Sequence, residues 1–138
     1  MNPQELLEGT RVPVQSELDI VMARMRGRAM AMQLGLSPSA ATLVATAISE
    51  LARNIILYAR RGEITLAMIE RGDQRGLLVT AEDDGPGIRD VTRAMQDGYS
   101  TSGRLGLGLP GVKRLMDEFD IQSRVGEGTI VMAKKWNA

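Results

Sequence analysis

The chain has 138 residues, 43% of them hydrophobic, which is enough for one domain with a buried core and short for two, so we expect a single domain over residues 1–138. Its 17 Lys and Arg residues balance 17 Asp and Glu residues, and only 3% of residues are aromatic, so neither charge nor base stacking favours binding to nucleic acid. The absence of cysteine and histidine excludes disulfides, thiolate metal sites and imidazole chemistry within this chain.

The first residues predict neither export nor membrane insertion. Residues 1–10 lack a basic segment followed by an apolar run, so they do not resemble a secretion signal. Residues 29–49 carry no formal charge, but Gln33, Ser37 and Pro38 interrupt them before the roughly 20 apolar residues that a membrane span needs. We therefore expect a soluble, cytoplasmic protein with no membrane partner.

The first two predicted elements are an edge strand and a helix. Residues 10–14 contain Pro13, which an edge strand tolerates. Ser16 is a suitable N-cap for the helix that follows. Apolar residues recur along this helix at steps of three and four, which predicts one buried face: Leu18, Met22, Met25, Ala29 and Met32. The simplest interpretation is that these side chains fill the core, and the alternative is a methionine-rich surface that binds a partner.

The middle of the chain predicts a second helix and a hairpin. Ser37 caps the helix, Pro38 occupies its first position, and the helix runs to about residue 58. Its apolar face consists of Val44, Ile48, Leu51, Ile55 and Tyr58. Residues 63–70 and 76–83 then read as two strands of a β-hairpin.

The remaining elements complete a two-layer arrangement. A short polar helix is predicted over residues 89–97 and another helix over residues 110–119. Residues 121–125 and 129–136 form a last hairpin around Gly126, Glu127 and Gly128. This order predicts an α/β fold of the α+β two-layer type, in which helices cover one face of a mixed, mostly antiparallel sheet.

Three polar motifs are candidates for a functional site, and the first lies on the second helix. Glu50 and Asn54 are four residues apart, so they project together about 6 Å apart along the axis. An ordinary solvated helix face is the common interpretation of such a pair. The functional alternative is a carboxylate that acts as a base beside an amide oxygen that binds Mg²⁺.

The second motif ends the first hairpin. Asp83, Gly85 and Gly87 alternate there, and glycines allow positive φ and a close approach of the backbone to a flat ligand. A carboxylate can accept a hydrogen bond from an adenine amino group. The hydroxyl of Thr129 could reach the same end of an adenine pocket. An ordinary Asp-Gly-Pro-Gly turn is the alternative.

The third motif is glycine-rich. Gly106, Gly108 and Gly111 have dinucleotide-loop spacing, but no strand precedes them, so a dinucleotide-binding unit is excluded. The glycines instead predict a hinge that leads to backbone N–H groups facing a phosphate at the start of the next helix. Arg104 and Lys113 could neutralise phosphate, or be solvated surface charges.

Together and in this order, the motifs resemble those of the GHKL ATPases with the Bergerat fold. The resemblance implies ATP as ligand, Mg²⁺ held by Asn54, Glu50 as the catalytic residue, and a mobile lid from about residue 88 to 105 whose far end is residues 103–108. The nucleotide-binding residues that it implies are Asn54, Asp83, Gly85, Gly87, Gly103, Arg104, Leu105, Gly106, Leu107, Gly108 and Thr129.

Within this superfamily the chain resembles the single-domain serine/threonine kinases of the anti-sigma-factor type. The stretches ISELARNIILYA, AEDDGPGI and GLGLPGVKRLMDEF are most similar to the switch kinases of the stressosome, and Tyr58 lies in the region where other anti-sigma kinases have a histidine. The resemblance implies transfer of the ATP γ-phosphoryl group to STAS-domain antagonist and scaffold proteins. It also implies that the released kinase binds and activates a phosphatase in a cascade that regulates sigma factors.

Three alternatives remain open at this point. An anti-sigma factor kinase would also sequester a sigma factor. A non-catalytic, ATP-gated binding module would have no need of Glu50. A detached catalytic domain of a histidine kinase would produce acid-labile phosphohistidine on another protein.

Overall fold

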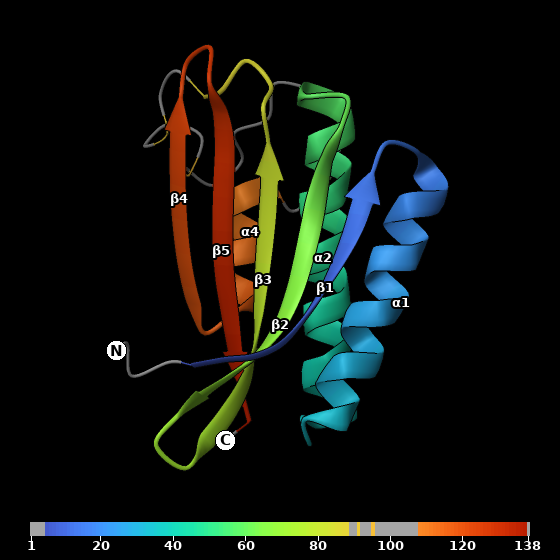
Figure 1. Ribbon diagram of the computed structural model, residues 1–138, viewed down its shortest axis with the longest axis vertical. Helices are drawn as coiled ribbons and strands as arrows, with labels where there is room; N and C mark the ends of the chain where they lie inside the picture. Colours follow the sequence, from blue (N-terminus) through green and yellow to red (C-terminus); the bar gives the residue numbers. More distant parts are fainter. Residues whose placement is uncertain (1–4, 89–90, 92–94, 96–107, 138) are drawn as a thin grey trace.

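The computed structural model describes residues 5–88, 91, 95 and 108–137, and these form two layers (Figure 1). The elements follow in the order β1 (Glu5–Val14), α1 (Glu17–Gln33), α2 (Pro38–Tyr58), β2 (Gly62–Arg71), β3 (Gln74–Asp83), α4 (Gly108–Leu115), β4 (Glu118–Arg124) and β5 (Gly128–Trp136). The short helix predicted over residues 89–97 lies largely outside the described residues.

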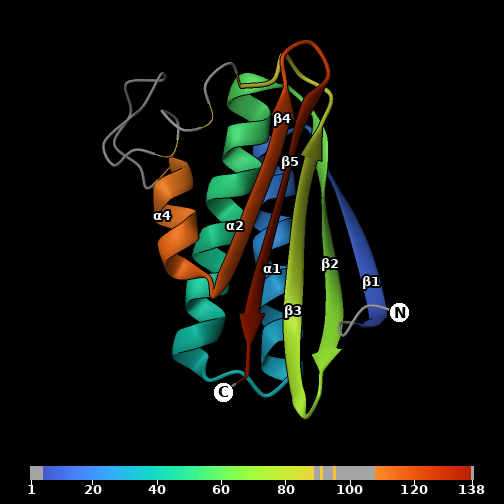
Figure 2. The same ribbon diagram turned by 90° about the vertical axis from the view of Figure 1, so that its left-hand side faces the viewer.

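The five strands form one sheet in the order β1-β2-β3-β5-β4. Figure 2 shows α1, α2 and α4 on the same side of this sheet, as the sequence predicts. All four strand pairings are antiparallel, so the prediction of a mixed sheet was wrong in that detail, although the fold class is confirmed. Two of these pairings are hairpins, β2 with β3 and β4 with β5. The longer connections, through α1 and α2 and through α4 and β4, also bring their strands together antiparallel.

The core lies between the sheet and the helices. The second helix begins as predicted, because the Ser37 hydroxyl accepts a hydrogen bond from the Ala40 N–H at 3.1 Å. Its predicted apolar face is buried at Val44, Ile48, Leu51 and Ile55, whereas Tyr58, the last helical residue, is 44% exposed. Helix α2 is long and apolar enough to cross a membrane, but 56% of its most apolar window is buried within the domain, as in a core helix.

Helix α1 buries a different face from the predicted one. The predicted stripe is exposed, to 67% at Leu18 and 61% at Met25. The buried residues are Ile20, Ala23, Gly27, Met30 and Ala31. Both faces of the helix have apolar residues at helical spacing. The face with the smaller residues is the buried one, because the space beside Ile48 of α2 is too small for a side chain at Gly27: a Cβ there would overlap the buried Ile48 side chain. The backbones therefore approach closely, and Leu18, Met22, Met25 and Met32 face solvent.

Two element ends also differ from the sequence-based expectations. Strand β1 begins at Glu5, five residues before the predicted strand. Helix α4 ends at Leu115, because the Asp117 N–H already bonds the Lys134 carbonyl at 2.9 Å and the chain enters the sheet. Phe119 therefore belongs to β4, where it packs against the core.

The two faces of α1 can be compared by a matched pair of substitutions. Met30→Ala should lower the free energy of unfolding by about 2–5 kcal/mol, because it leaves a cavity in the core. Met25→Ala should change it by no more than about 0.5 kcal/mol, because that side chain is exposed. Chemical denaturation measures both, and equal losses would contradict the described packing of α1.

Candidate functional site

Three polar side chains form one row across the ends of three neighbouring strands. Asp83 of β3 pairs directly with Thr129 of β5, which pairs directly with Ser123 of β4. Residues directly opposite each other in paired strands share a face of the sheet. The row lies two residues from buried Ala81 and Val131, so it lies on the face that the helices cover.

The Asp83 carboxylate is held by backbone donors. The Gly85 N–H donates to its Oδ1 at 2.9 Å, and the Thr129 backbone N–H also bonds it. Burial raises the pKa of Asp83 above its usual value, while these two hydrogen bonds act against the rise and the neighbouring charge of Asp84 adds to it. The site thus presents a partly desolvated carboxylate in a fixed orientation.

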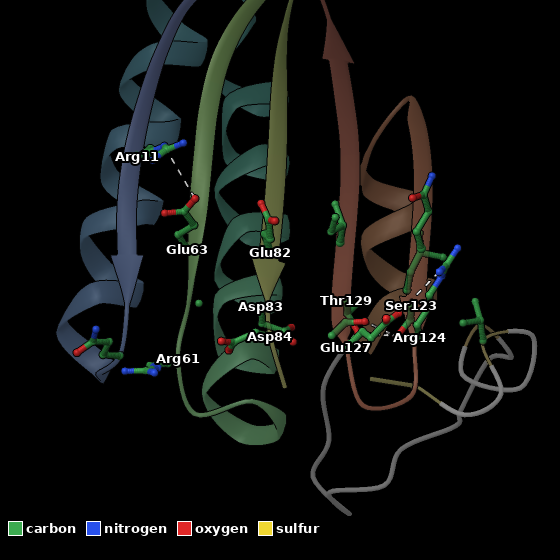
Figure 3. Close-up of a pocket in the computed structure, with 17 residues that line it drawn as sticks. Arg11, Arg61, Glu63, Glu82, Asp83, Asp84, Ser123, Arg124, Glu127 and Thr129 are labelled. Carbon is green, nitrogen blue, oxygen red and sulfur yellow. Dashed lines mark hydrogen bonds and ion pairs between the residues drawn. The ribbon is translucent and has the colours of Figure 1, made fainter. Parts of the chain in front are cut away.

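Ser123 connects the row to the chain that leaves β3. Its hydroxyl accepts a hydrogen bond from the Ile88 N–H at 2.7 Å. The same oxygen lies 3.1 Å from the Gly128 carbonyl oxygen and 2.7 Å from the Thr129 hydroxyl. Figure 3 shows Ser123 and Thr129 side by side at the ends of β4 and β5.

The glycines around this row permit close backbone contacts. Gly87 has φ of 77°, and a Cβ there would overlap the backbone of Arg124. Gly128 has φ of 117°, and a Cβ there would overlap the backbone of Asp83. At Gly85 a Cβ would lie 2.6 Å from the Cβ of Ala59, just after α2. These contacts join β3, the last hairpin and the end of α2.

A cavity of about 1200 Å³ opens beside the row. Asp83, Ser123 and Thr129 reach the edge of this cavity. Glu63, Glu82 and Ile130 also line it, and they alternate with the row along their strands, so most of the cavity lies on the opposite, uncovered face of the sheet, among charged residues of both signs (Figure 3). Those charged residues are Arg11, Arg61, Glu63, Glu82, Asp84, Arg124 and Glu127.

Glu50 and Asn54 lie further back on α2 and do not line this cavity. Glu50 is buried, and its Oε1 lies 3.2 Å from a guanidinium nitrogen of Arg53. Asn54 is half-buried. Among the described residues no group of three or more acidic side chains could hold a metal ion.

The phosphate end of the predicted site is described only in part. Residues 103–107, with Gly103, Arg104, Leu105, Gly106 and Leu107, lie outside the described residues, as does most of the predicted lid. Gly108 is the first residue of α4 and has φ of 62°. Lys113 of α4 is exposed, while Pro110 and Val112 are buried and α4 packs against α2.

Two residues at this site were missed by the sequence analysis. Ser123 could have been found from the register of the last hairpin, because a short loop over residues 125–127 places it opposite Thr129. Arg53 lies three residues after Glu50 on the same helix, a spacing at which ion pairs form.

Comparison with known proteins identifies relatives across nearly the whole chain. Residues 14–135 match the family model of the histidine kinase-like ATPase domain. The serine/threonine-protein kinase RsbT of Bacillus subtilis is 53% identical over 125 residues, which cover 91% of this chain and 94% of RsbT. An anti-sigma F factor of Caldanaerobacter subterraneus is 33% identical over 67% of this chain and 68% of its own length.

Two solved structures share the fold. The crystal structure of the RsbU and RsbW domains of a Mycobacterium tuberculosis protein matches with a TM-score of 0.64 and 18% identity. The match covers 94% of this chain and 32% of the length of that protein's chain. A chain in the crystal structure of the SiaB–SiaC complex of Pseudomonas aeruginosa matches with a TM-score of 0.57 and 15% identity. The match covers 95% of this chain and 90% of the length of that chain.

Two glycines with similar backbone conformations test the packing of this site. Gly126→Ala places a side chain at φ of 82° in open space, so it should cost about 1–2 kcal/mol of unfolding free energy. Gly87→Ala has the same conformational cost and adds an overlap with the Arg124 backbone, so it should cost at least about 1 kcal/mol more. Denaturation curves of the two variants measure the difference, and equal losses would show that Gly87 is not packed as described.

Proposed function

The chain belongs to the histidine kinase-like ATPase domain family and is a serine/threonine-protein kinase of the RsbT type, and we propose how its residues perform and direct phosphoryl transfer. In this proposal residues 1–138 form one cytoplasmic domain that transfers the γ-phosphoryl group of ATP to Ser or Thr of STAS-domain proteins. The half-buried Asp83 carboxylate, held by backbone donors on the helix-covered face of the sheet, is the observation that carries the assignment of the site.

The base of ATP binds at the row of Asp83 and Thr129. The ionised Asp83 carboxylate accepts a hydrogen bond from the adenine amino group. Gly85 and Gly87 support this role because their lack of side chains leaves the backbone accessible to a flat ring.

The phosphates extend from the base toward α2 and α4. The Asn54 amide oxygen supplies one ligand to Mg²⁺, and the bound ion neutralises charge on the phosphates. Gly108 and its preceding residues Gly103, Arg104, Leu105, Gly106 and Leu107 supply backbone N–H groups near the phosphates. The N-terminal end of α4 adds its positive dipole.

Glu50 acts on the acceptor hydroxyl. Its carboxylate orients the Ser or Thr hydroxyl and takes its proton as the oxygen attacks the γ-phosphorus. The bond from that phosphorus to the bridging oxygen breaks, and ADP leaves with the electron pair. Arg53 supports this role because its ion pair restrains the Glu50 side chain within the helix surface.

The partners are STAS-domain antagonist and scaffold proteins of a stressosome, and a phosphatase that the released kinase activates. Relatedness to RsbT supports this choice. Further support comes from two proteins that share this fold, one solved as a chain with RsbU and RsbW domains and one as a SiaB–SiaC complex. The exposed Met22 and Met25 of α1 support partner binding, because they leave a flexible apolar surface in solvent.

A second candidate function is that of an anti-sigma factor kinase, which would also sequester a sigma factor. The anti-sigma F factors at 33% and 31% identity favour it. They share less of the sequence than RsbT does, so we place the stressosome kinase first.

The decisive experiment is incubation of the protein with ATP, Mg²⁺ and a purified STAS-domain protein, followed by mapping of the phosphorylated residue. Acid-stable phosphoserine or phosphothreonine on the STAS protein is the expected product. Acid-labile phosphohistidine would assign the chain to the histidine-kinase chemistry instead, and binding of ATP without any transfer would assign it to the non-catalytic modules.

Substitution of Glu50 separates catalysis from nucleotide binding. Glu50→Gln should lower the rate of transfer by roughly 10²–10⁴-fold, because it removes a general base, while the affinity for ATP stays close to that of the original protein. Glu17→Gln, a change of an exposed carboxylate on α1 away from the site, should leave the rate unchanged. Transfer kinetics and calorimetry on the same preparations measure both effects. An equal fall of rate and ATP affinity would point to a damaged pocket and not to a lost base.

The pKa of Asp83 predicts a pH dependence of ATP affinity. The ionised carboxylate accepts from the adenine amino group more strongly than the neutral carboxyl group does. Burial raises the pKa of Asp83, so affinity should fall as the pH is lowered through this raised value. Asp83→Asn should weaken binding at pH 7 by about 1.5–3 kcal/mol and remove this part of the pH dependence. Binding measured by calorimetry from pH 7 downward tests this, and identical pH profiles for the two proteins would contradict it.

A further inference from the structure

We propose that Ser123 is a positioning residue that holds the Thr129 hydroxyl as a hydrogen-bond acceptor, so that the site selects a purine with an amino group over one with a carbonyl group. The inference deepens the proposed function, because it rests on the base of ATP binding beside Asp83. The observations that carry it are the three contacts of the Ser123 hydroxyl.

The direction of each hydrogen bond follows from the number of protons available. A serine hydroxyl has one proton and two lone pairs. The Ile88 N–H can only donate, so it occupies one lone pair of Ser123. The Gly128 carbonyl can only accept, so the 3.1 Å contact takes the single Ser123 proton.

The Thr129 hydroxyl must then donate to Ser123. Their oxygens lie 2.7 Å apart, which is a hydrogen-bond distance for two hydroxyls. Because the Ser123 proton already points to Gly128, the proton in this contact comes from Thr129. If Ser123 donated to Thr129 instead, the contact between the Ser123 and Gly128 oxygens would contain no proton. Thr129 is therefore left with lone pairs and no proton for a ligand.

The consequence is a row that contains acceptors only. Asp83, when ionised, offers carboxylate oxygens, and Thr129 beside it in the register offers hydroxyl lone pairs. Adenine has an amino group with two N–H donors, which such a row favours. Hypoxanthine has a carbonyl oxygen at the same position, which meets like partial charge, and its edge offers the two acceptors only the single N1–H donor. Ser123 contributes to this choice without contacting the base.

The test compares binding of ADP with binding of inosine diphosphate, which replaces the amino group by a carbonyl group. Equilibrium titrations require no phosphoryl transfer, so the result is independent of kinase activity. Ser123→Ala removes the acceptor to which Thr129 donates, so the Thr129 hydroxyl can donate to a carbonyl group or accept from an amino group. The preference for ADP should therefore fall by about threefold to tenfold, the effect of one net hydrogen bond. Ser123→Thr retains a hydroxyl and should restore the preference.

A double variant distinguishes positioning from general support. Thr129→Val removes the hydroxyl that Ser123 is proposed to orient, and should itself lower the preference for ADP. In that background Ser123→Ala should cause no further change in the ratio of the two affinities. Thermal unfolding without nucleotide confirms that each variant is folded. If Ser123→Ala does not fold, the test is the ratio of the ADP and inosine diphosphate affinities in Thr129→Val.

Two results would overturn the inference. One is an equal loss of both affinities in Ser123→Ala, which would mean that Ser123 only supports the structure through Ile88. The other is an unchanged ADP preference in Thr129→Val. A Ser123-dependent preference for ADP over inosine diphosphate, together with no phosphoryl transfer to STAS-domain proteins, would instead refute the proposed kinase function. It would still support the positioning role of Ser123.

Discussion

The close pairing of β3 with β5 at Asp83 and Thr129 is the constraint on which the site depends. It is possible because Gly128, directly before Thr129, has no Cβ that would overlap the Asp83 backbone. This contact joins the two hairpins into one sheet and aligns Asp83, Thr129 and Ser123 in one row. The same pairing continues into the core through Ala81 and Val131, so the geometry of the site and the stability of the sheet share a common origin.

Helix α2 connects this row to the proposed chemistry. Its buried face fixes it against the sheet, and Ala59, just beyond its end, contacts Gly85 of the segment that follows Asp83. Asn54 and Glu50 lie roughly one and a half and two and a half turns before that contact. In the proposed function this is the direction from the base toward the transferred phosphate. A core helix therefore separates the proposed base recognition from the proposed catalysis. Helix α1 lies on the other side of α2 from α4 and leaves Leu18 and Met25 exposed (Figure 2).

Local signals in the sequence were sufficient for much of the fold. Capping by Ser37, the periodicity of α2 and the turn residues of both hairpins predicted their elements, because each depends on neighbours in the chain. The buried face of α1 was predicted wrongly, because two stripes have the same spacing and the choice depends on how Gly27 fits against Ile48. The roles of Ser123 and Arg53 depend on strand register and on rotamers, which composition and motifs do not contain.

The central claim is that a nucleotide base binds on the helix-covered face of the sheet, where β3, β4 and β5 end. The most direct measurement is a map of backbone amide chemical shifts during titration with ADP. We expect the largest changes at Gly85, Ser123 and Thr129, with small changes over α1. Saturable binding whose largest changes fall on α1 or on the opposite face of the sheet, with no effect at these three amides, would contradict the account.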